Sequence, residues 1–257
     1  ISTACASGSH GIGEALRKIQ YGEMDVAITG GVEATMTRFN FGGYNALRVL
    51  SKNNSAPQEA SRPFDLNRDG FVLSEGGGIL ILEELDHALA RQASIYGEVS
   101  GYASNSGAHH MVMPDSDGKD AARAMAEAVR DAGLKPEDID YINAHATSTT
   151  ANDRAETKAI KNVFGARAYK IPISSTKSMI GHTIGAAGGI EGVVCALVLK
   201  HQFIPPTINY KTPDPECDLD YVPNTGRKTS VKAIVSNSFG FGNANACLVF
   251  QQYSKGR

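Results

Sequence analysis

Cys5 is the residue in this sequence whose type and position are best suited to chemistry. It follows a strand-like run at residues 1–4, and apolar residues then recur at helical spacing over residues 6–21, so we predict that Cys5 lies at a helix N-terminus. Free N–H groups and the positive end of the helix dipole favour a thiolate there and could also hold an oxyanion. A catalytic nucleophile is one interpretation of Cys5, and a small buried hydrophobic residue is the other.

Two histidines, His145 and His182, also follow predicted strands or turns, in the stretches NAHATST and KSMIGH. Together with Cys5 they have the atom types that bind zinc, but the sequence has no HExxH-like pair, so no metal site is predicted. The remaining histidines are predicted to be surface or packing residues: His10, His87, His109, His110 and His201.

Two glycine-rich stretches could bring backbone amides close to a ligand. Residues 236–245, SNSFGFGNAN, are predicted to form a turn between two apolar strands, where an amide could point into a cavity under a phenylalanine ring. A plain hairpin loop is an equally good interpretation. Residues 76–78 are three glycines, but no Gly-Lys-Ser/Thr follows, so close backbone packing is predicted there and not a phosphate loop.

Strands and helices alternate along most of the chain, as in α/β proteins with a parallel sheet. Predicted strands cover residues 25–31, 71–82, 96–104, 139–145 and 170–175, and predicted helices cover 6–21, 86–91, 119–132, 151–164 and a buried stretch from 182 to 200. A strand, a short turn and a buried helix occur at Cys5 and again at residues 177–182. This repetition predicts two similar halves with a boundary near residues 92–96.

Composition excludes several classes of function. The chain has 257 residues, 42% of them hydrophobic, and its formal net charge of −2 argues against a nucleic-acid partner. Four cysteines without CxxC spacing indicate a reducing compartment. We expect neither a signal peptide nor a membrane-spanning segment. The sequence opens with Ile inside a strand-like run, so we expect it to be part of a longer polypeptide.

The motifs TACAS, NAHATST, KSMIGH and NSFGFGN occur in this order, together with SRPFDLNRDGFVLSEG and PPTINY. In these motifs and in their order, essentially the whole chain resembles the elongating β-ketoacyl-acyl carrier protein synthases, types II and I, of the thiolase superfamily. The resemblance implies a thiolase-like α/β/α layered fold. Residues 1–95 would be the end of the first half with the nucleophile, and residues 96–257 the second half with the His and Lys motifs. The family has a long segment before the nucleophile that would be absent here.

The resemblance implies a decarboxylative Claisen condensation that elongates fatty acids by two carbons. Cys5 would hold the acyl chain, while His145 and His182 would donate hydrogen bonds to the thioester carbonyl of malonyl-acyl carrier protein. Neutral imidazoles suit this role because they can stabilise an enolate without protonating it outright. Starter-unit enzymes of the superfamily carry His and Asn at these positions, so two histidines indicate an elongating acyltransferase.

Further site residues follow from the same resemblance. Lys177 would lie in the same site as the histidines, and Glu191 would support the Lys and His network. The amides of Cys5 and Phe241 would form the oxyanion hole, with the Phe241 ring as a gate to the acyl pocket. Two threonines would bind the phosphopantetheine arm: Thr147 and Thr149.

The resemblance also implies the partners. An acyl carrier protein would deliver the phosphopantetheine, so no permanently bound cofactor is expected, and the full-length enzyme would be a homodimer without membrane insertion. We expect it in the bacterial cytoplasm, or in an organelle stroma or matrix if the source is eukaryotic. Ala146, Asn243 and Ala244 depart from the commoner family residues, which affects loop detail and acyl-length preference.

Three alternatives stay open at this stage. The chain could belong to the ketosynthase domain of a polyketide synthase, which has the same chemistry. A non-catalytic partner resembling a chain-length factor is disfavoured because such partners lack the cysteine that is present here as Cys5. A degradative thiolase is also disfavoured. Such enzymes use a second cysteine in the final loop, and residues 241–245 of this sequence contain no cysteine.

Overall fold

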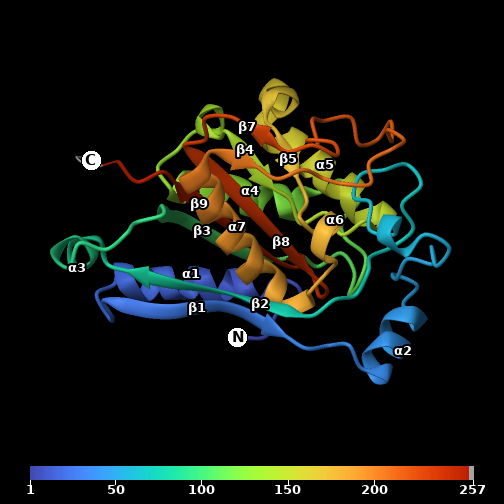
Figure 1. Cartoon of the computed structure of the whole chain (residues 1–257), viewed down its shortest axis with the longest axis horizontal. Coiled ribbons are helices and arrows are strands. Elements are labelled where there is room, and N and C mark those ends of the chain that lie inside the picture. The colour runs from blue at the N-terminus through green and yellow to red at the C-terminus, as the bar shows by residue number, and fades with distance from the viewer. Residues whose placement is uncertain (255–257) are drawn as a thin grey trace.

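The computed structural model describes residues 1–254 and forms four layers (Figure 1). The helices are α1 (Ser7–Gln20), α2 (Arg38–Ala46), α3 (Leu85–Ala90), α4 (Lys119–Asp131), α5 (Thr150–Phe164), α6 (Lys177–Ile180) and α7 (Ala187–His201). The strands are β1 (Val26–Glu33), β2 (Gly76–Glu83), β3 (Glu98–Ser106), β4 (Tyr141–Asn143), β5 (Ile173–Ser174), β6 (Phe203–Ile204), β7 (Arg227–Lys228), β8 (Ala233–Gly240) and β9 (Ala244–Gln251).

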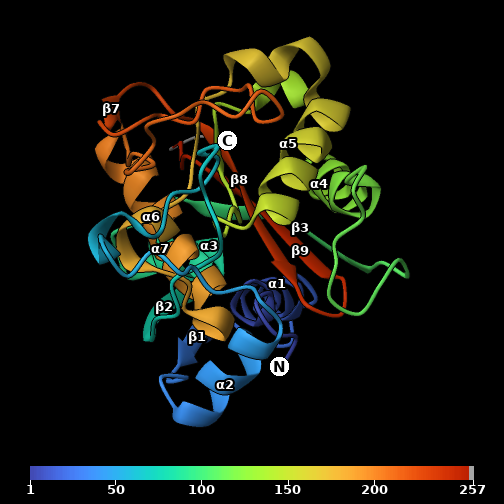
Figure 2. The same cartoon turned by 90° about the vertical axis from the view of Figure 1, so that its right-hand side faces the viewer.

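A five-stranded sheet of order β3-β9-β8-β4-β5 forms the centre of the molecule. Helices α4 and α5 cover one face of it, as Figure 2 shows, and α1 and α7 cover the other. The antiparallel ribbon β1-β2 packs on the far side of α1 and α7. Two hydrophobic clusters fill the two faces of the central sheet, one around Met125 and Ile142 and the other around Ile12 and Leu248.

The central sheet is mixed, so the predicted parallel sheet is only partly correct. Strand β4 pairs in parallel with β5 and β8, but β9 pairs antiparallel with both β8 and β3. The β8-β9 pair is a hairpin whose loop is only residues 241–243, which is shorter than the turn predicted over 236–245. Strands β4 and β5 are shorter than the predicted ranges 139–145 and 170–175. A 3-10 helix occupies residues 165–170 before β5, and after Asn143 the chain leaves the sheet toward the pocket that His145 lines.

Glycines allow α7 to lie against its neighbours at backbone distance, as the sequence predicted. A Cβ on Gly78 of β2 would lie 2.3 Å from the backbone nitrogen of Ile190, and a Cβ on Gly188 would lie 2.3 Å from Ser9 Oγ of α1. Side chains at these positions would force the layers apart. The three glycines at residues 76–78 therefore serve packing.

Helix α7 corrects one expectation about membranes. Residues 184–201 are long and apolar enough to cross a bilayer, with a mean hydropathy of 1.4, and the sequence analysis expected no such segment. In the structure 67% of this stretch is buried between α1, the ribbon and β8, and it carries Glu191 in an ion pair. A core helix explains its composition.

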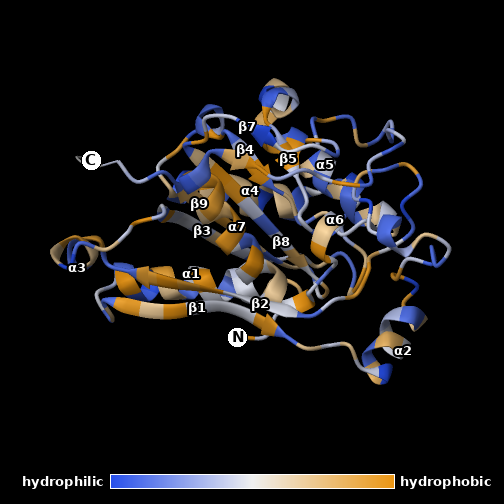
Figure 3. Cartoon of the chain, viewed as in Figure 1, coloured by the Kyte–Doolittle hydropathy of each residue, from blue (hydrophilic) through white to orange (hydrophobic). Residues whose placement is uncertain are grey.

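The outer face of the β1-β2 ribbon is apolar and exposed. Ile28 and Ile81 are cross-strand partners with 79% and 66% of their surfaces exposed, and Val32 on the same face is 72% exposed. Figure 3 shows hydrophobic stretches along both strands. An apolar face of this kind is typical of an interaction surface.

Candidate active site

A tight turn places Cys5 just before α1, as the sequence predicted. Ala4 has a left-handed backbone with φ 49°, and Ser7 Oγ braces the turn by accepting from the Thr3 N–H at 2.8 Å and donating to the Ala4 carbonyl at 2.7 Å. Gly240 of β8 lies against this turn, since a Cβ there would be 2.6 Å from the Thr3 carbonyl oxygen. The turn directs the Cys5 thiol into a pocket, with only 3% of the residue exposed.

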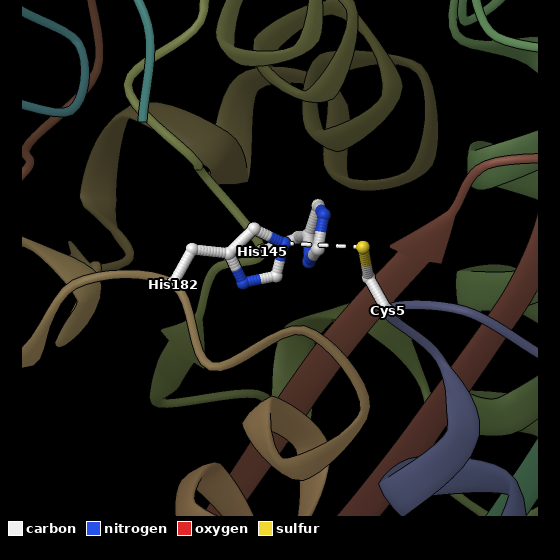
Figure 4. A group of neighbouring side chains, drawn as sticks. All are labelled: Cys5, His145 and His182. Atoms are coloured by element: carbon white, nitrogen blue, oxygen red, sulfur yellow. Dashed lines mark hydrogen bonds between the residues drawn. The ribbon is translucent and has the colours of Figure 1, made fainter. Parts of the chain in front are cut away.

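Both predicted histidines lie beside this thiol (Figure 4). His182 Nε2 is 3.1 Å from Cys5 Sγ, and the His145 and His182 rings meet edge to face with centroids 5.5 Å apart. Phe71 packs edge-on against His182, and Phe239 packs in the same way against His145. The three functional side chains come from segments far apart in sequence and are all buried.

The hydrogen bonds of His182 determine its tautomer. The Ile184 N–H donates to Nδ1 at 3.3 Å, so in the neutral ring Nε2 carries the proton and faces the sulfur. Cys5, His145 and His182 have ligand atoms within 4.8 Å of one another, which would suit a metal by spacing alone. A protonated Nε2 has no lone pair for a metal, so this arrangement suits a hydrogen-bond donor better.

Burial keeps both imidazoles neutral. It lowers the pKa of His145 and of His182 well below 6.5, and the nearby charge of Lys177 lowers both pKa values further. Neither ring is therefore an imidazolium at neutral pH, so each can act as a neutral donor.

The resting state of Cys5 differs from the prediction. Burial raises its pKa to about 11, although Lys177 and the backbone amides of Phe241 and Cys5 act in the opposite direction. The backbone amides favour the thiolate, as expected, but desolvation outweighs them in this pocket, so the resting group is the thiol. The two amides that stabilise the charged sulfur are nevertheless those predicted for an oxyanion hole.

Lys177 and Glu191 form a buried ion pair next to these groups. Both side chains are almost fully buried, at 2% and 1% exposed, and burial raises the pKa of Glu191 while Lys177 opposes that rise. The Lys177 carbonyl accepts a hydrogen bond from Ser61 Oγ at 2.7 Å, which fixes the start of α6. The structure thus brings together a pair that lies 14 residues apart in the chain.

Three further predicted residues line the same cavity, whose volume is about 120 Å³. Phe241 reaches it from the β8-β9 loop. Thr147 and Thr149 reach it from the turn before α5, with their hydroxyl oxygens 3.0 Å apart. All eight residues predicted for the site therefore lie in the pocket or in the ion pair beside it.

Glu156 is a site residue that the sequence analysis missed. Its carboxylate accepts from the backbone N–H of His145 at 2.9 Å and of Ala146 at 2.7 Å, and Asn237 Nδ2 donates to it at 3.0 Å. Burial raises its pKa to about 7. The available signal was a charged residue on the inner face of the predicted helix 151–164. Glu156 fixes the backbone that carries His145.

Arg68 is a second buried charged residue that the sequence analysis did not single out, because the RDG stretch has the residue types of a simple turn. Its side chain is fully buried and paired with Asp153 and Asp214. A buried guanidinium with two carboxylate partners ties three separate segments of the chain together.

Comparison with known proteins gives two family models that match. The model described as "beta-ketoacyl synthase, N-terminal domain" matches residues 1–88. The model described as "beta-ketoacyl synthase, C-terminal domain" matches residues 96–211. The 3-oxoacyl-[acyl-carrier-protein] synthase 2 of Synechocystis is 54% identical over 251 residues, with 98% of this chain and 60% of the relative covered. That of Coxiella burnetii is 48% identical over 252 residues, which cover 98% of this chain and 61% of the relative.

A solved structure agrees with the sequence relatives. It is a ketosynthase of a type II polyketide synthase in complex with its acyl-carrier protein, with a TM-score of 0.97 and 44% identity over 99% of this chain and 62% of that one. This likeness confirms the predicted thiolase-like α/β fold. The chain spans about 60% of the length of the curated relatives it matches.

Proposed function

Because this chain belongs to the β-ketoacyl synthase family, we propose that it carries out a decarboxylative Claisen condensation on thioesters of acyl carrier protein. The observation that carries the proposal is the buried trio of a thiol and two neutral imidazoles, with His182 Nε2 3.1 Å from Cys5 Sγ. A nucleophile and two neutral donors around one point are what this reaction needs.

The first half-reaction is transfer of an acyl chain to Cys5. The sulfur attacks the acyl thioester carbonyl, the bond from that carbonyl to the carrier sulfur breaks, and the thiol proton leaves with the carrier thiol. The amides of Cys5 and Phe241 hold the oxyanion of the tetrahedral intermediate. The resting thiol is protonated, so the thiolate forms only when the proton leaves. These amides and the charge of Lys177 stabilise the negative sulfur at that point.

The second half-reaction is condensation. Loss of carbon dioxide from malonyl-acyl carrier protein leaves an enolate, whose oxygen accepts hydrogen bonds from His145 and His182. The enolate carbon attacks the acyl carbonyl on Cys5, the carbon–sulfur bond breaks, and the sulfur takes up a proton. The product is a β-ketoacyl thioester two carbons longer.

The other site residues have supporting roles in this proposal. Lys177, held by Glu191, orients the imidazoles and attracts the malonyl carboxylate. Thr147 and Thr149 bind the phosphopantetheine arm that the carrier protein brings, so the enzyme needs no cofactor of its own. The ring of Phe241 gates the acyl pocket.

The assembly and location belong to the same proposal. A homodimer of the full-length protein is supported by the exposed apolar face of the β1-β2 ribbon, and sedimentation of the purified full-length protein tests it. A reducing compartment, such as the bacterial cytoplasm or an organelle stroma or matrix, is supported by four buried cysteines that are all free. Localisation of a tagged protein tests this part.

The experiment for the reaction itself separates its two halves. In the full-length protein, Cys5→Gln should abolish condensation but keep malonyl decarboxylation, because only acyl transfer needs the sulfur. Cys195→Ala is the matched control, since this buried thiol lies on α7 outside the pocket. Substantial β-ketoacyl product from Cys5→Gln would contradict a covalent mechanism.

A second candidate is condensation in a polyketide pathway. It is supported by the 44% identity to the ketosynthase of the type II polyketide synthase, although the 3-oxoacyl-[acyl-carrier-protein] synthase 2 of Synechocystis is more similar, at 54% identity. Assays that compare a saturated acyl primer with a poly-β-keto primer on the carrier distinguish the two. We expect faster turnover of the saturated primer.

A further inference from the structure

Arg68 lies outside the pocket, yet it is bound to the turn that carries two pocket threonines. Its Nε donates to the Thr149 carbonyl at 3.3 Å and its Nη2 donates to the Thr150 carbonyl at 3.2 Å. Its Nη1 donates to the Asp65 carbonyl at 2.7 Å and to Asp214 Oδ2 at 2.9 Å. One planar guanidinium therefore joins the loop before residue 70, the start of α5 and the loop around residue 214.

The turn that Arg68 holds has an uncommon backbone. Ser148, between the two threonines, has a φ of 71°, which is a left-handed conformation seldom adopted by residues other than glycine, asparagine and aspartate. The segment around Arg68 also braces this residue directly. The Gly70 N–H donates to the Ser148 carbonyl at 3.0 Å, and the Arg62 N–H donates to the Ser148 hydroxyl at 3.0 Å.

Charge balance explains how a buried cation is tolerated here. Asp153 Oδ2 lies 3.3 Å from Arg68 Nε and also accepts the Phe64 N–H at 2.9 Å. Asp214 provides the second carboxylate and is shared with Arg154, whose side chain is 33% exposed. Such a site requires the fixed, forked donor geometry of arginine, which the point charge of lysine does not reproduce.

We propose that Arg68 is a positioning residue for the phosphopantetheine arm of the substrate. By holding the carbonyls of Thr149 and Thr150, it keeps the 147–150 turn in its left-handed form and the two threonine hydroxyls on the pocket wall. This inference rests on the proposed function, because it requires that a pantetheine thioester enters this pocket. Arg68 itself touches neither the thiol nor the imidazoles.

The test uses two alkylating reagents on the full-length protein. Bromoacetyl-pantetheine must use the arm site to reach Cys5, whereas iodoacetamide needs only an accessible thiol. Arg68→Lys should raise the half-saturating concentration of the pantetheine reagent about tenfold, which is the size expected for the loss of one hydrogen bond at the arm. Its limiting rate and the iodoacetamide rate should stay within about twofold, and KM for the carrier thioester should rise without a similar fall in kcat.

Arg154→Lys is the matched control, because Arg154 shares Asp214 with Arg68 but directs its guanidinium to Asp214 and Glu216 and away from the threonine turn. This variant should leave the half-saturating concentration of the pantetheine reagent unchanged. If Arg68→Lys fails to fold, Asp214→Asn tests the same anchor from its outer side, with Arg68 and Asp153 still paired. A smaller rise in the same constant, about threefold, is expected from losing a charge-assisted contact.

Three results would overturn the inference. Equal half-saturating concentrations of the pantetheine reagent for Arg68→Lys, Arg154→Lys and the parent would show that Arg68 does not position the arm. An equal loss toward both reagents would show general damage to the pocket. If the parent itself fails to saturate with the pantetheine reagent, the proposed function falls together with the inference, whereas saturation of the parent and an unchanged Arg68→Lys remove the inference alone.

Discussion

Replacing His145 or His182 with alanine should slow malonyl decarboxylation by about 10²–10³-fold, which is the cost of losing one donor to an oxyanion in a water-excluded site. The structure sets this magnitude. Both rings are buried and neutral, and their centroids lie 5.5 Å apart, so that two N–H groups can reach one oxygen. The double variant should be only slightly slower than either single variant, because the two donors act on one charge as a unit.

The assay is release of labelled carbon dioxide from malonyl-acyl carrier protein by the full-length protein. Alkylation of Cys5 by iodoacetamide is the control for an intact pocket, and it should change far less than decarboxylation in each histidine variant. Losses that multiply in the double variant would refute the shared oxyanion, because independent donors would act at separate steps.

The remaining predictions concern the gate, the thiol and the carboxylate behind His145. Phe241→Ala keeps the backbone amide and should relax the preference among short and long acyl primers; identical primer profiles in variant and parent would remove the gate. The rate of Cys5 alkylation should rise about tenfold per pH unit from pH 7 and level off only near the pKa of about 11, so a plateau near pH 8 would contradict a buried thiol. Glu156 has its pKa raised from 4.5 to about 7, so its contribution to folding is fully present below pH 4.5 and is lost as pH rises through 7. The stability of the parent relative to Glu156→Gln, measured by urea unfolding, should therefore fall between pH 5 and pH 8, and a constant difference would argue against the raised pKa.

Local patterns in the sequence determined the residue types of the site and most of the helices. Helical spacing placed α1 directly after Cys5, and α4 and α5 lie within a residue of their predicted bounds. The motifs named Cys5, His145, His182 and Lys177, and the structure gathers all four around one cavity and its ion pair. These features depend on contacts between near neighbours or on the chemistry of single side chains, and both are present in the sequence itself.

Tertiary structure decided what depends on burial and on distant segments. Cys5 is a thiol and not a thiolate because the folded chain removes it from water, which the position at a helix end does not reveal. The mixed order of the central sheet comes from β9 pairing with β3, some 140 residues earlier in the chain. Glu156 and Arg68 act through backbone groups of other segments, and sequence spacing carries no record of such partners. Composition alone would also allow α7 to cross a membrane, and only its packing between two sheets makes it a core helix.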